Sequence, residues 1–167
     1  MGVRMAAMSD CEAIARVHVQ SWQSTYRGIV SESFLNALSI ESRTKNWEWA
    51  LQHPNENELV YVMEVEGAVI GFINGGKCRD SEMGIDAELY ALYLLEAEQR
   101  KGFGFLLFDA LVEWLKSRSY TSMMVWVLER NSAVEFYKRI GGQFLTKKKV
   151  KIGEDEVDEV AFMWHFC

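Results

Sequence analysis

The residues with the clearest chemical potential lie in the segment "QRKGFG", which spans residues 99–104. It follows the apolar run "ELYALYLL" and precedes "FLLFDALVEWL", so it predicts a glycine-containing turn between a strand and a helix. The first turn of a helix presents unpaired N–H groups at the positive end of the helix dipole, and together these bind phosphate. Gly102 and Gly104 allow close backbone approach, and Arg100 and Lys101 add positive charge. A tight connection that needs glycines only for packing is the alternative.

Two common phosphate-binding loops do not fit this segment. A dinucleotide fingerprint requires a third glycine three residues further on, where this chain has Leu107. A P-loop requires Gly-Lys-Ser/Thr at the helix start, whereas Lys101 precedes Gly102 and no Ser or Thr follows. A nucleotide-binding module is thus a weaker hypothesis, and it would require that ATP or NAD compete for binding at this loop.

A second segment, "VLERNSAVEFYKRIGGQF", follows at a suitable distance and predicts a short helix with Asn131 as N-cap and Gly141 as its stop. Together the two segments resemble the GCN5-related N-acetyltransferase (GNAT) family. The family's Arg/Gln-x-x-Gly-x-Gly/Ala motif is matched by Gln99, Gly102 and Gly104, and its Asn…Phe-Tyr-x-x-x-Gly motif by Asn131, Phe136, Tyr137 and Gly141. The motifs cover Leu92 to Phe144, and the order of predicted elements fits the family over nearly the whole chain. Arg100 stands where the family often has glycine, and Glu96 where many members have proline.

The resemblance implies acetyl-CoA as co-substrate and no metal. By position, the backbone N–H groups from Arg100 through Phe105 would hold the CoA pyrophosphate, and Asn131 would steady the pantetheine end of the second helix. Leu94 and Leu95 would pair with the pantetheine arm like an added strand, and their donors could polarise the thioester carbonyl. The implied cofactor-binding residues are Leu94, Leu95, Gln99, Arg100, Lys101, Gly102, Phe103, Gly104, Phe105 and Asn131.

Tyr137 matches the family's usual general acid for the departing thiolate. A model tyrosine has a pKa of ~10 and a model thiol ~8.5, so complete proton transfer is uphill by about 2 kcal/mol. We therefore expect Tyr137 chiefly to hydrogen-bond the sulfur, with complete transfer helped by the environment. The alternative is that Tyr137 only packs beside Phe136 on the short helix.

Glu88 begins the strand that leads to the loop, where several family members place a carboxylate near the acceptor amine. Direct transfer from an ammonium of pKa ~10.4 to a carboxylate of pKa ~4.3 is uphill by about 8 kcal/mol. Glu88 as the base therefore requires burial, a water relay or an amine whose pKa is depressed by the site. The alternatives are that Glu88 orients the cation or is a solvated carboxylate at the strand end.

Acceptor-binding candidates lie in the N-terminal helices and the closing hairpin. Trp22 and Tyr26, in "SWQSTYRG", could form aromatic walls for an apolar or cationic amine, with core packing as the alternative. The acidic turn "GEDEVDE" lies opposite a lysine-rich strand, which cross-strand charge pairing explains. Attraction of polyamines or lysine side chains is the other interpretation of this turn.

Hydrophobic periodicity predicts the elements that position these residues. A first helix begins near Ser9, with Ser9 and Glu12 spaced as a capping box, and breaks at Gly28. Further segments follow in order: helical regions at 31–39 and 43–52, a hairpin at 58–76 turning at Glu66-Gly67, a strand at 87–95, a helix at 103–118, a strand at 121–128, a short helix at 131–142 and a hairpin at 142–166 around Gly153. This order predicts an α/β fold with a mixed, mostly antiparallel sheet flanked by helices. The resemblance adds splayed central strands.

The composition indicates the number of domains and argues against several other functional classes. A chain of 167 residues with 49% hydrophobic residues predicts a single domain over 1–167. A net charge of −6 argues against nucleic acid and mildly favours cationic small molecules. The three cysteines, Cys11, Cys78 and Cys167, are widely spaced and suggest unpaired thiols in a cytoplasmic protein. We expect no signal peptide, membrane span or metal site.

The leading hypothesis is a cytoplasmic, acetyl-CoA-dependent N-acetyltransferase acting on a primary amine of a small molecule or peptide. A non-catalytic acyl-CoA sensor on the same fold is the alternative. The partners expected are acetyl-CoA and an amine acceptor, and this family often forms homodimers.

Overall fold

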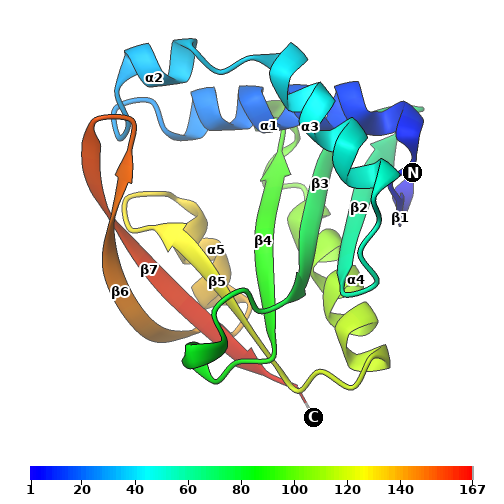
Figure 1. The fold of residues 1–167 in the computed structure, drawn as a ribbon, viewed down its shortest axis with the longest axis vertical. Helices are drawn as coiled ribbons and strands as arrows, with labels where there is room; N and C mark the ends of the chain where they lie inside the picture. Colours follow the sequence, from blue (N-terminus) through cyan, green and yellow to red (C-terminus); the bar gives the residue numbers. More distant parts are fainter. Residues whose placement is uncertain (167) are drawn as a thin grey trace.

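The computed structural model describes residues 1–166 and shows a seven-stranded sheet with helices on both faces (Figure 1). The strands are β1 (Gly2–Met5), β2 (Glu58–Val65), β3 (Ala68–Lys77), β4 (Ala87–Leu94), β5 (Ser122–Leu128), β6 (Gln143–Ile152) and β7 (Asp155–His165). The helices are α1 (Cys11–Thr25), α2 (Glu32–Asn36), α3 (Ile40–Gln52), α4 (Phe103–Ser117) and α5 (Ala133–Arg139). Three short 3₁₀ turns span Met8–Asp10, Ser81–Met83 and Glu96–Glu98. The mixed α/β fold predicted from the sequence is confirmed.

The sheet opens between its two central strands. The strand order is β1-β2-β3-β4-β5-β7-β6, and every neighbouring pair is antiparallel except β4 and β5. The parallel pairing of β4 with β5 ends at Leu89 and Val125, whereas β4 continues to Leu94 and β5 to Leu128. The two strands therefore diverge beyond this point, as the resemblance implied.

Two layers of side chains cover the sheet. On one face α4 and α5 contribute Leu107, Leu111 and Tyr137 to the largest core cluster. On the other face α1 buries Ile14 and Val17 against β2 and β3. The opening between β4 and β5 therefore lies between two layers of helices, with α1 on one side and α5 on the other (Figure 1).

Local turn chemistry agrees with the sequence at the hairpins. Glu66 and Gly67 connect β2 and β3 with φ angles of 52° and 80°, the left-handed values of a type I′ turn. Gly28 follows the end of α1 with φ 82°, and Gly141 follows α5 with φ 93°. These breaks were predicted at the correct residues.

The N-terminus differs from the prediction. The capping box of Ser9 and Glu12 is wrong: α1 begins at Cys11, and Asp10 Oδ2 accepts the Ala7 N–H at 2.7 Å. Strand β1 was not predicted because four residues, mostly exposed, have too little hydrophobic periodicity to detect.

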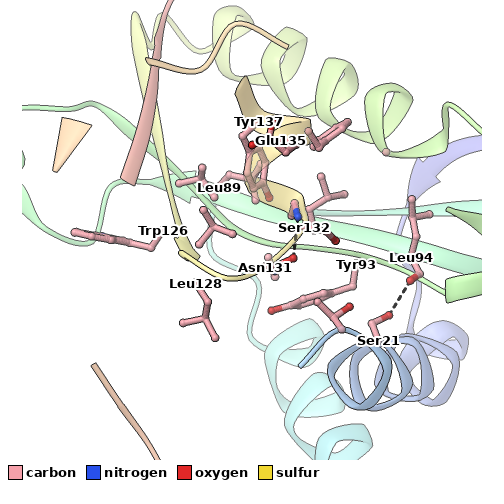
Figure 2. Close-up of a pocket in the computed structure, with 18 of the residues that line it drawn as sticks. Ser21, Leu89, Tyr93, Leu94, Trp126, Leu128, Asn131, Ser132, Glu135 and Tyr137 are labelled. Carbon is pink, nitrogen blue, oxygen red and sulfur yellow. Dashed lines mark hydrogen bonds between the residues drawn. The ribbon is translucent and has the colours of Figure 1, made fainter. Parts of the chain in front are cut away.

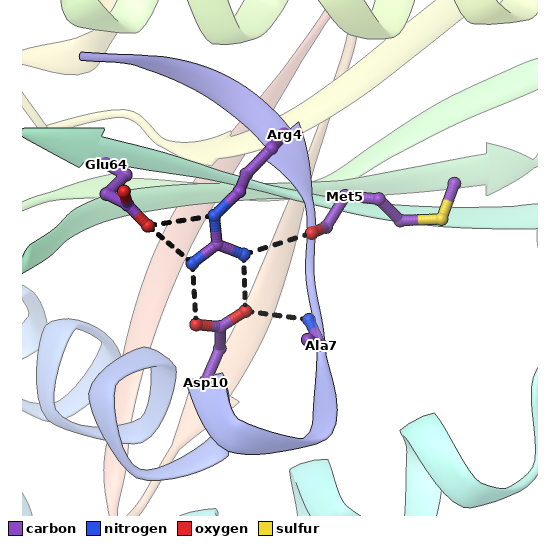
Figure 3. A network of polar contacts seen from close by, with 5 residues as sticks. All are labelled: Arg4, Met5, Ala7, Asp10 and Glu64. Atoms are coloured by element: carbon purple, nitrogen blue, oxygen red, sulfur yellow. Dashed lines mark hydrogen bonds and ion pairs between the residues drawn. The ribbon is translucent and has the colours of Figure 1, made fainter. Parts of the chain in front are cut away.

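A polar network ties β1 to the start of α1 (Figure 3). Arg4 donates to both oxygens of Asp10, at 2.8 and 2.9 Å, and also contacts Glu64 of β2 at 2.7 Å. Because Asp10 is buried and carries a formal charge, these bonds offset its desolvation. They hold the pKa of Asp10 below its ordinary value.

Some general features of the sequence can be placed. Cys11 and Cys78 are buried free thiols, whereas Cys167 lies outside the described residues. Among residues 1–166 we find no helix that is both long and apolar enough to cross a membrane.

Candidate active site

A cavity of about 1060 Å³ occupies the opening between β4 and β5. Its walls come from the diverging halves of both strands, from α1 and α5, and from the start of α4. Figure 2 shows the side chains of Trp126 and Leu128 from β5, Tyr137 from α5 and Ser21 from α1 around this space. The cavity exists because β4 and β5 pair over only three residues each, from Ala87 to Leu89 and from Met123 to Val125.

Most of the predicted site residues share this cavity. Those that line it are Glu88, Leu94, Gln99, Arg100, Gly102, Gly104, Phe105, Asn131, Tyr137, Trp22 and Tyr26. Three predicted cofactor residues, Leu95, Lys101 and Phe103, do not line it. The Lys101 ammonium instead contacts the carboxylate of Glu98 at 3.1 Å.

The glycine-containing turn leaves a row of free backbone donors. Gly102, with φ 90°, caps α4, and the first amide to donate within the helix is that of Leu106, to the Gly102 carbonyl at 3.2 Å. Within residues 1–166, the N–H groups of residues 100–105 donate no hydrogen bond. Arg100 also adopts a left-handed backbone conformation, with φ 61°, although it has a side chain. The turn can therefore bind an anion through its backbone.

The edge of β4 offers backbone groups from one of the two predicted leucines. The Leu95 N–H donates to the Ile70 carbonyl at 3.0 Å and is therefore already paired. Because backbone groups alternate along a strand, those of Leu94 point toward the open edge. The Leu94 carbonyl accepts a hydrogen bond there from Ser21 Oγ at 2.9 Å (Figure 2). It also accepts one from Gln99 Nε2 at 3.3 Å.

Asn131 joins α5 to α1. The N-cap of α5 is Ser132, one residue after the Asn131 predicted from the sequence. The Asn131 Oδ1 accepts the Ala133 N–H at 2.8 Å, and its Nδ2 donates to the Tyr26 hydroxyl at 3.3 Å. Tyr26 is buried and makes an edge contact with Trp22, their ring centroids 4.6 Å apart. These three residues therefore stabilise the cavity wall as well as lining it.

Tyr137 projects from α5 into the cavity and is 4% exposed. Its ring makes edge contacts with Phe136 and Trp164, at centroid distances of 5.4 and 5.9 Å. Within residues 1–166 its hydroxyl forms no hydrogen bond, and burial raises its pKa well above its ordinary value of 10. The phenol is therefore protonated at neutral pH and available as a donor.

Glu88 is buried and paired. Arg79 contacts both of its oxygens, with Nη2–Oε2 at 2.5 Å and Nε–Oε1 at 3.2 Å, and the Arg79 backbone N–H also donates to Oε1. The Arg79 guanidinium lies 4.5 Å from the centroid of the Tyr90 ring. The sequence analysis did not include Arg79, because its partner lies across a loop whose path the sequence does not reveal.

The closing hairpin adds another group that was missed. Glu159 of β7 lines the cavity with Trp126, at the end of the acidic turn that the sequence analysis explained by charge pairing, with attraction of polyamines or lysine side chains as the other interpretation. The pairing itself is present, since Lys147 and Lys149 both contact Asp158. Glu159 carries no motif signal, and its role in the cavity depends on how the hairpin folds back.

The arrangement combines a row of free N–H groups, an open strand edge and a buried phenol in one cavity. The acetyltransferase (GNAT) family model matches residues 19–142, more than half of the chain. The chain belongs to the GNAT family of acetyltransferases.

Individual relatives agree with this assignment. The chain is 35% identical to the uncharacterized N-acetyltransferase YuaI of Bacillus subtilis (strain 168) over 97% of this chain and 91% of that protein. Among solved structures, PaiA N-acetyltransferase from Thermoplasma acidophilum, in complex with coenzyme A, superposes with a TM-score of 0.73 at 24% identity, covering 94% of this chain and 96% of that one. YncA from Salmonella typhimurium, with its cofactor acetyl-CoA, gives a TM-score of 0.74 at 20% identity, covering 100% and 94%. The similarity to these two structures concerns the fold.

Proposed function

We propose that the protein is an acetyl-CoA-dependent N-acetyltransferase that transfers acetyl directly to a primary amine of a small molecule or peptide. The observation that supports this most is the single cavity that joins the free N–H groups of the loop to the Tyr137 phenol. Membership of the GNAT family and the coenzyme A in PaiA and acetyl-CoA in YncA support the choice of donor.

Acetyl-CoA would be anchored at the start of α4. The free amides between Arg100 and Phe105 face the position proposed for the pyrophosphate, and the Arg100 side chain lines the same cavity. The pantetheine arm would run along the open edge of β4 as an added strand. Leu94 would supply its backbone N–H there, since its carbonyl already accepts hydrogen bonds from Ser21 and Gln99, and the Leu95 N–H is occupied by Ile70.

The reaction exchanges a C–S bond for a C–N bond and moves one proton. The free amine nitrogen attacks the thioester carbonyl carbon, the amide C–N bond forms, and the C–S bond breaks to release CoA. The nitrogen then loses its extra proton to water, and the released thiolate takes one up from water to become the thiol. Tyr137 would donate a hydrogen bond to the departing sulfur, which carries the developing negative charge. The products are the N-acetylated acceptor and CoA thiol.

The acceptor must lose a proton before it can attack. Glu88 is the proposed proton acceptor, and it acts through a water molecule that passes the proton on to solvent. Complete transfer from an ammonium to a carboxylate of ordinary pKa is uphill by about 8 kcal/mol by any route. Arg79 holds both Glu88 oxygens and therefore orients the carboxylate. Trp22 and Tyr26 would form the aromatic wall of the acceptor site.

Two measurements test this function. Calorimetry with acetyl-CoA should show binding, and a free-thiol assay over a panel of primary amines should show acetyl-dependent release of CoA. Absence of acetyl-CoA binding at millimolar ligand would refute the proposal. Binding without thiol release from any amine would instead favour an acyl-CoA sensor.

Location and assembly are also proposals. The buried free thiols Cys11 and Cys78 suit a reducing compartment, so we propose that the protein is cytoplasmic. A homodimer, common in this family, can be tested by light scattering of the purified protein.

A further inference from the structure

Glu159 is a half-buried carboxylate that lacks a hydrogen-bond partner. It lies on β7 directly opposite Leu128 of β5 and Lys148 of β6, and its side chain is 21% exposed. Within residues 1–166 neither oxygen accepts a hydrogen bond. Its nearest cation is the Lys148 ammonium at 3.9 Å, too far for a hydrogen bond, and that ammonium lies 3.9 Å from the centroid of the Trp126 ring.

The contrast with Glu88 shows which carboxylate is available. The Glu88 side chain is 4% exposed, and both of its oxygens accept hydrogen bonds from Arg79. Arg79 thus uses its Nε and Nη2 on Glu88, and the two residues form a neutral pair. Glu159 therefore leaves one negative charge in the acceptor half of the cavity without a hydrogen-bonded cation.

The surroundings of Glu159 make this charge costly without a ligand. Burial raises the pKa of Glu159, Lys148 and Arg79 lower it, and Glu88 raises it. Burial is the largest of these effects, because neither cation forms a hydrogen bond with the carboxylate. A carboxylate in this position is stabilised when a cationic donor enters the cavity.

We propose that Glu159 binds the ammonium group of the acceptor and selects a cationic primary amine on an aromatic or apolar carrier, with no carboxylate beside the amine. This inference rests on the proposed acetyl transfer. The walls of the cavity near Glu159 include Trp126, Trp22 and Tyr26, which suit such a carrier and can contact a cation through their ring faces. An amino acid is disfavoured because its carboxylate would face the carboxylate of Glu159. The Arg79 guanidinium would not offset this repulsion, because its Nε and Nη2 already donate to Glu88.

The order of events follows from this placement. Glu159 orients the ammonium, which then gives one proton through water to Glu88 or to solvent, and the neutral nitrogen attacks the thioester carbon. The Glu159 carboxylate stabilises the bound acceptor. It is thus a specificity-determining residue that touches the substrate.

The test uses the full chain saturated with CoA, with three small probes of similar size. 2-Phenylethylamine is cationic at pH 7, O-benzylhydroxylamine is neutral, and phenylalanine carries both an ammonium and a carboxylate. Calorimetry should show that the wild-type protein binds 2-phenylethylamine and prefers it to phenylalanine. Glu159→Gln should raise the Kd for 2-phenylethylamine by about 10- to 100-fold and change the Kd for O-benzylhydroxylamine by no more than about twofold.

Glu156→Gln is the matched control, because Glu156 is on the same strand, is exposed and lies outside the cavity. This substitution removes the same charge and should leave the binding of every probe unchanged. Glu159→Asp should retain part of the binding, since it keeps the charge. Melting temperatures check folding, and Glu159→Gln should melt close to the wild type, because it removes a half-buried charge whose contact with Lys148 is long and without a hydrogen bond.

Equal binding of 2-phenylethylamine to the wild type and Glu159→Gln would overturn the proposal, as would tighter binding of phenylalanine. No binding of 2-phenylethylamine to the CoA-saturated wild type would overturn it as well. These results differ from failure of the proposed function, which would appear as absence of CoA or acetyl-CoA binding. In the transfer reaction, the effect of Glu159→Gln should fall on the KM of the amine, with the KM of acetyl-CoA unchanged.

Discussion

Replacement of Tyr137 by phenylalanine removes one hydroxyl from the centre of the cavity and keeps the ring. The ring's contacts with Phe136 and Trp164 persist in this variant, and no hydrogen bond within residues 1–166 is lost. We therefore expect Tyr137→Phe to fold like the wild type, with a melting temperature within about 2 °C. Any loss of activity then reports on the phenol alone.

The size of the loss follows from the pKa of the phenol. Burial raises the pKa of Tyr137 further above that of a thiol, so complete proton transfer to the sulfur is uphill. The phenol then acts as a hydrogen-bond donor to a developing charge, which contributes about 1.5–3 kcal/mol. This corresponds to a fall in kcat of about 10- to 150-fold at saturating acetyl-CoA.

The assay is thiol release at saturating acetyl-CoA with the best amine from the panel. Tyr61→Phe is the control, since Tyr61 lies on β2 outside the cavity. An unchanged kcat in Tyr137→Phe would refute the role of the phenol. A fall greater than about 1,000-fold would refute the hydrogen-bond reasoning and indicate that complete proton transfer limits the reaction.

Three further predictions concern binding and stability, and the second, on Asp10, has a part that depends on pH. Arg100→Gly should raise the Kd for acetyl-CoA several-fold, because a charge is lost, without lowering the melting temperature, because φ 61° suits glycine. Asp10→Asn should destabilise the fold by about 1 kcal/mol, or about 3 °C, since Arg4 is partly exposed and its ion pair is screened. The wild type should lose the stability that this group contributes as the pH falls below about 3.8, because the pKa of Asp10 is lower in the folded state. The fold should also weaken above about pH 10, where Tyr26, Tyr93 and Tyr137 must ionise on unfolding while burial raises their folded pKa values.

Each has a result that would contradict it. Calorimetry giving equal acetyl-CoA affinity for Arg100→Gly would exclude the side chain from the anion site. For Asp10→Asn, an unchanged thermal transition at pH 7 would show that the network of Figure 3 contributes nothing measurable. Alkaline unfolding should occur at the same pH as the rise in ultraviolet absorbance that marks ionisation of the tyrosine phenols. Ionisation of these tyrosines well before unfolding would contradict their burial.

The sequence by itself determined the family and the outline of the cofactor loop. Both signals are local: a strand and a helix joined by Gly102 and Gly104, and a short helix that carries Tyr137 after Asn131. Local periods and turn residues report on neighbours within a few positions, so most elements and the hairpin turns were predicted correctly. Strand β1 and the cap of α1 were not, because the short β1 has almost no pattern and the cap depends on a contact with Arg4.

Only the tertiary structure decided which groups lie in the cavity and how they are paired. The choice between Leu94 and Leu95 depends on which edge of β4 pairs with β3, a matter of sheet register. The pairing of Glu88 with Arg79 depends on the path of a loop. Glu159 enters the cavity because β7 pairs with β5 beside the opening, far from either motif in the chain. Contacts between distant segments leave no local pattern, and these contacts govern which side chains line the cavity.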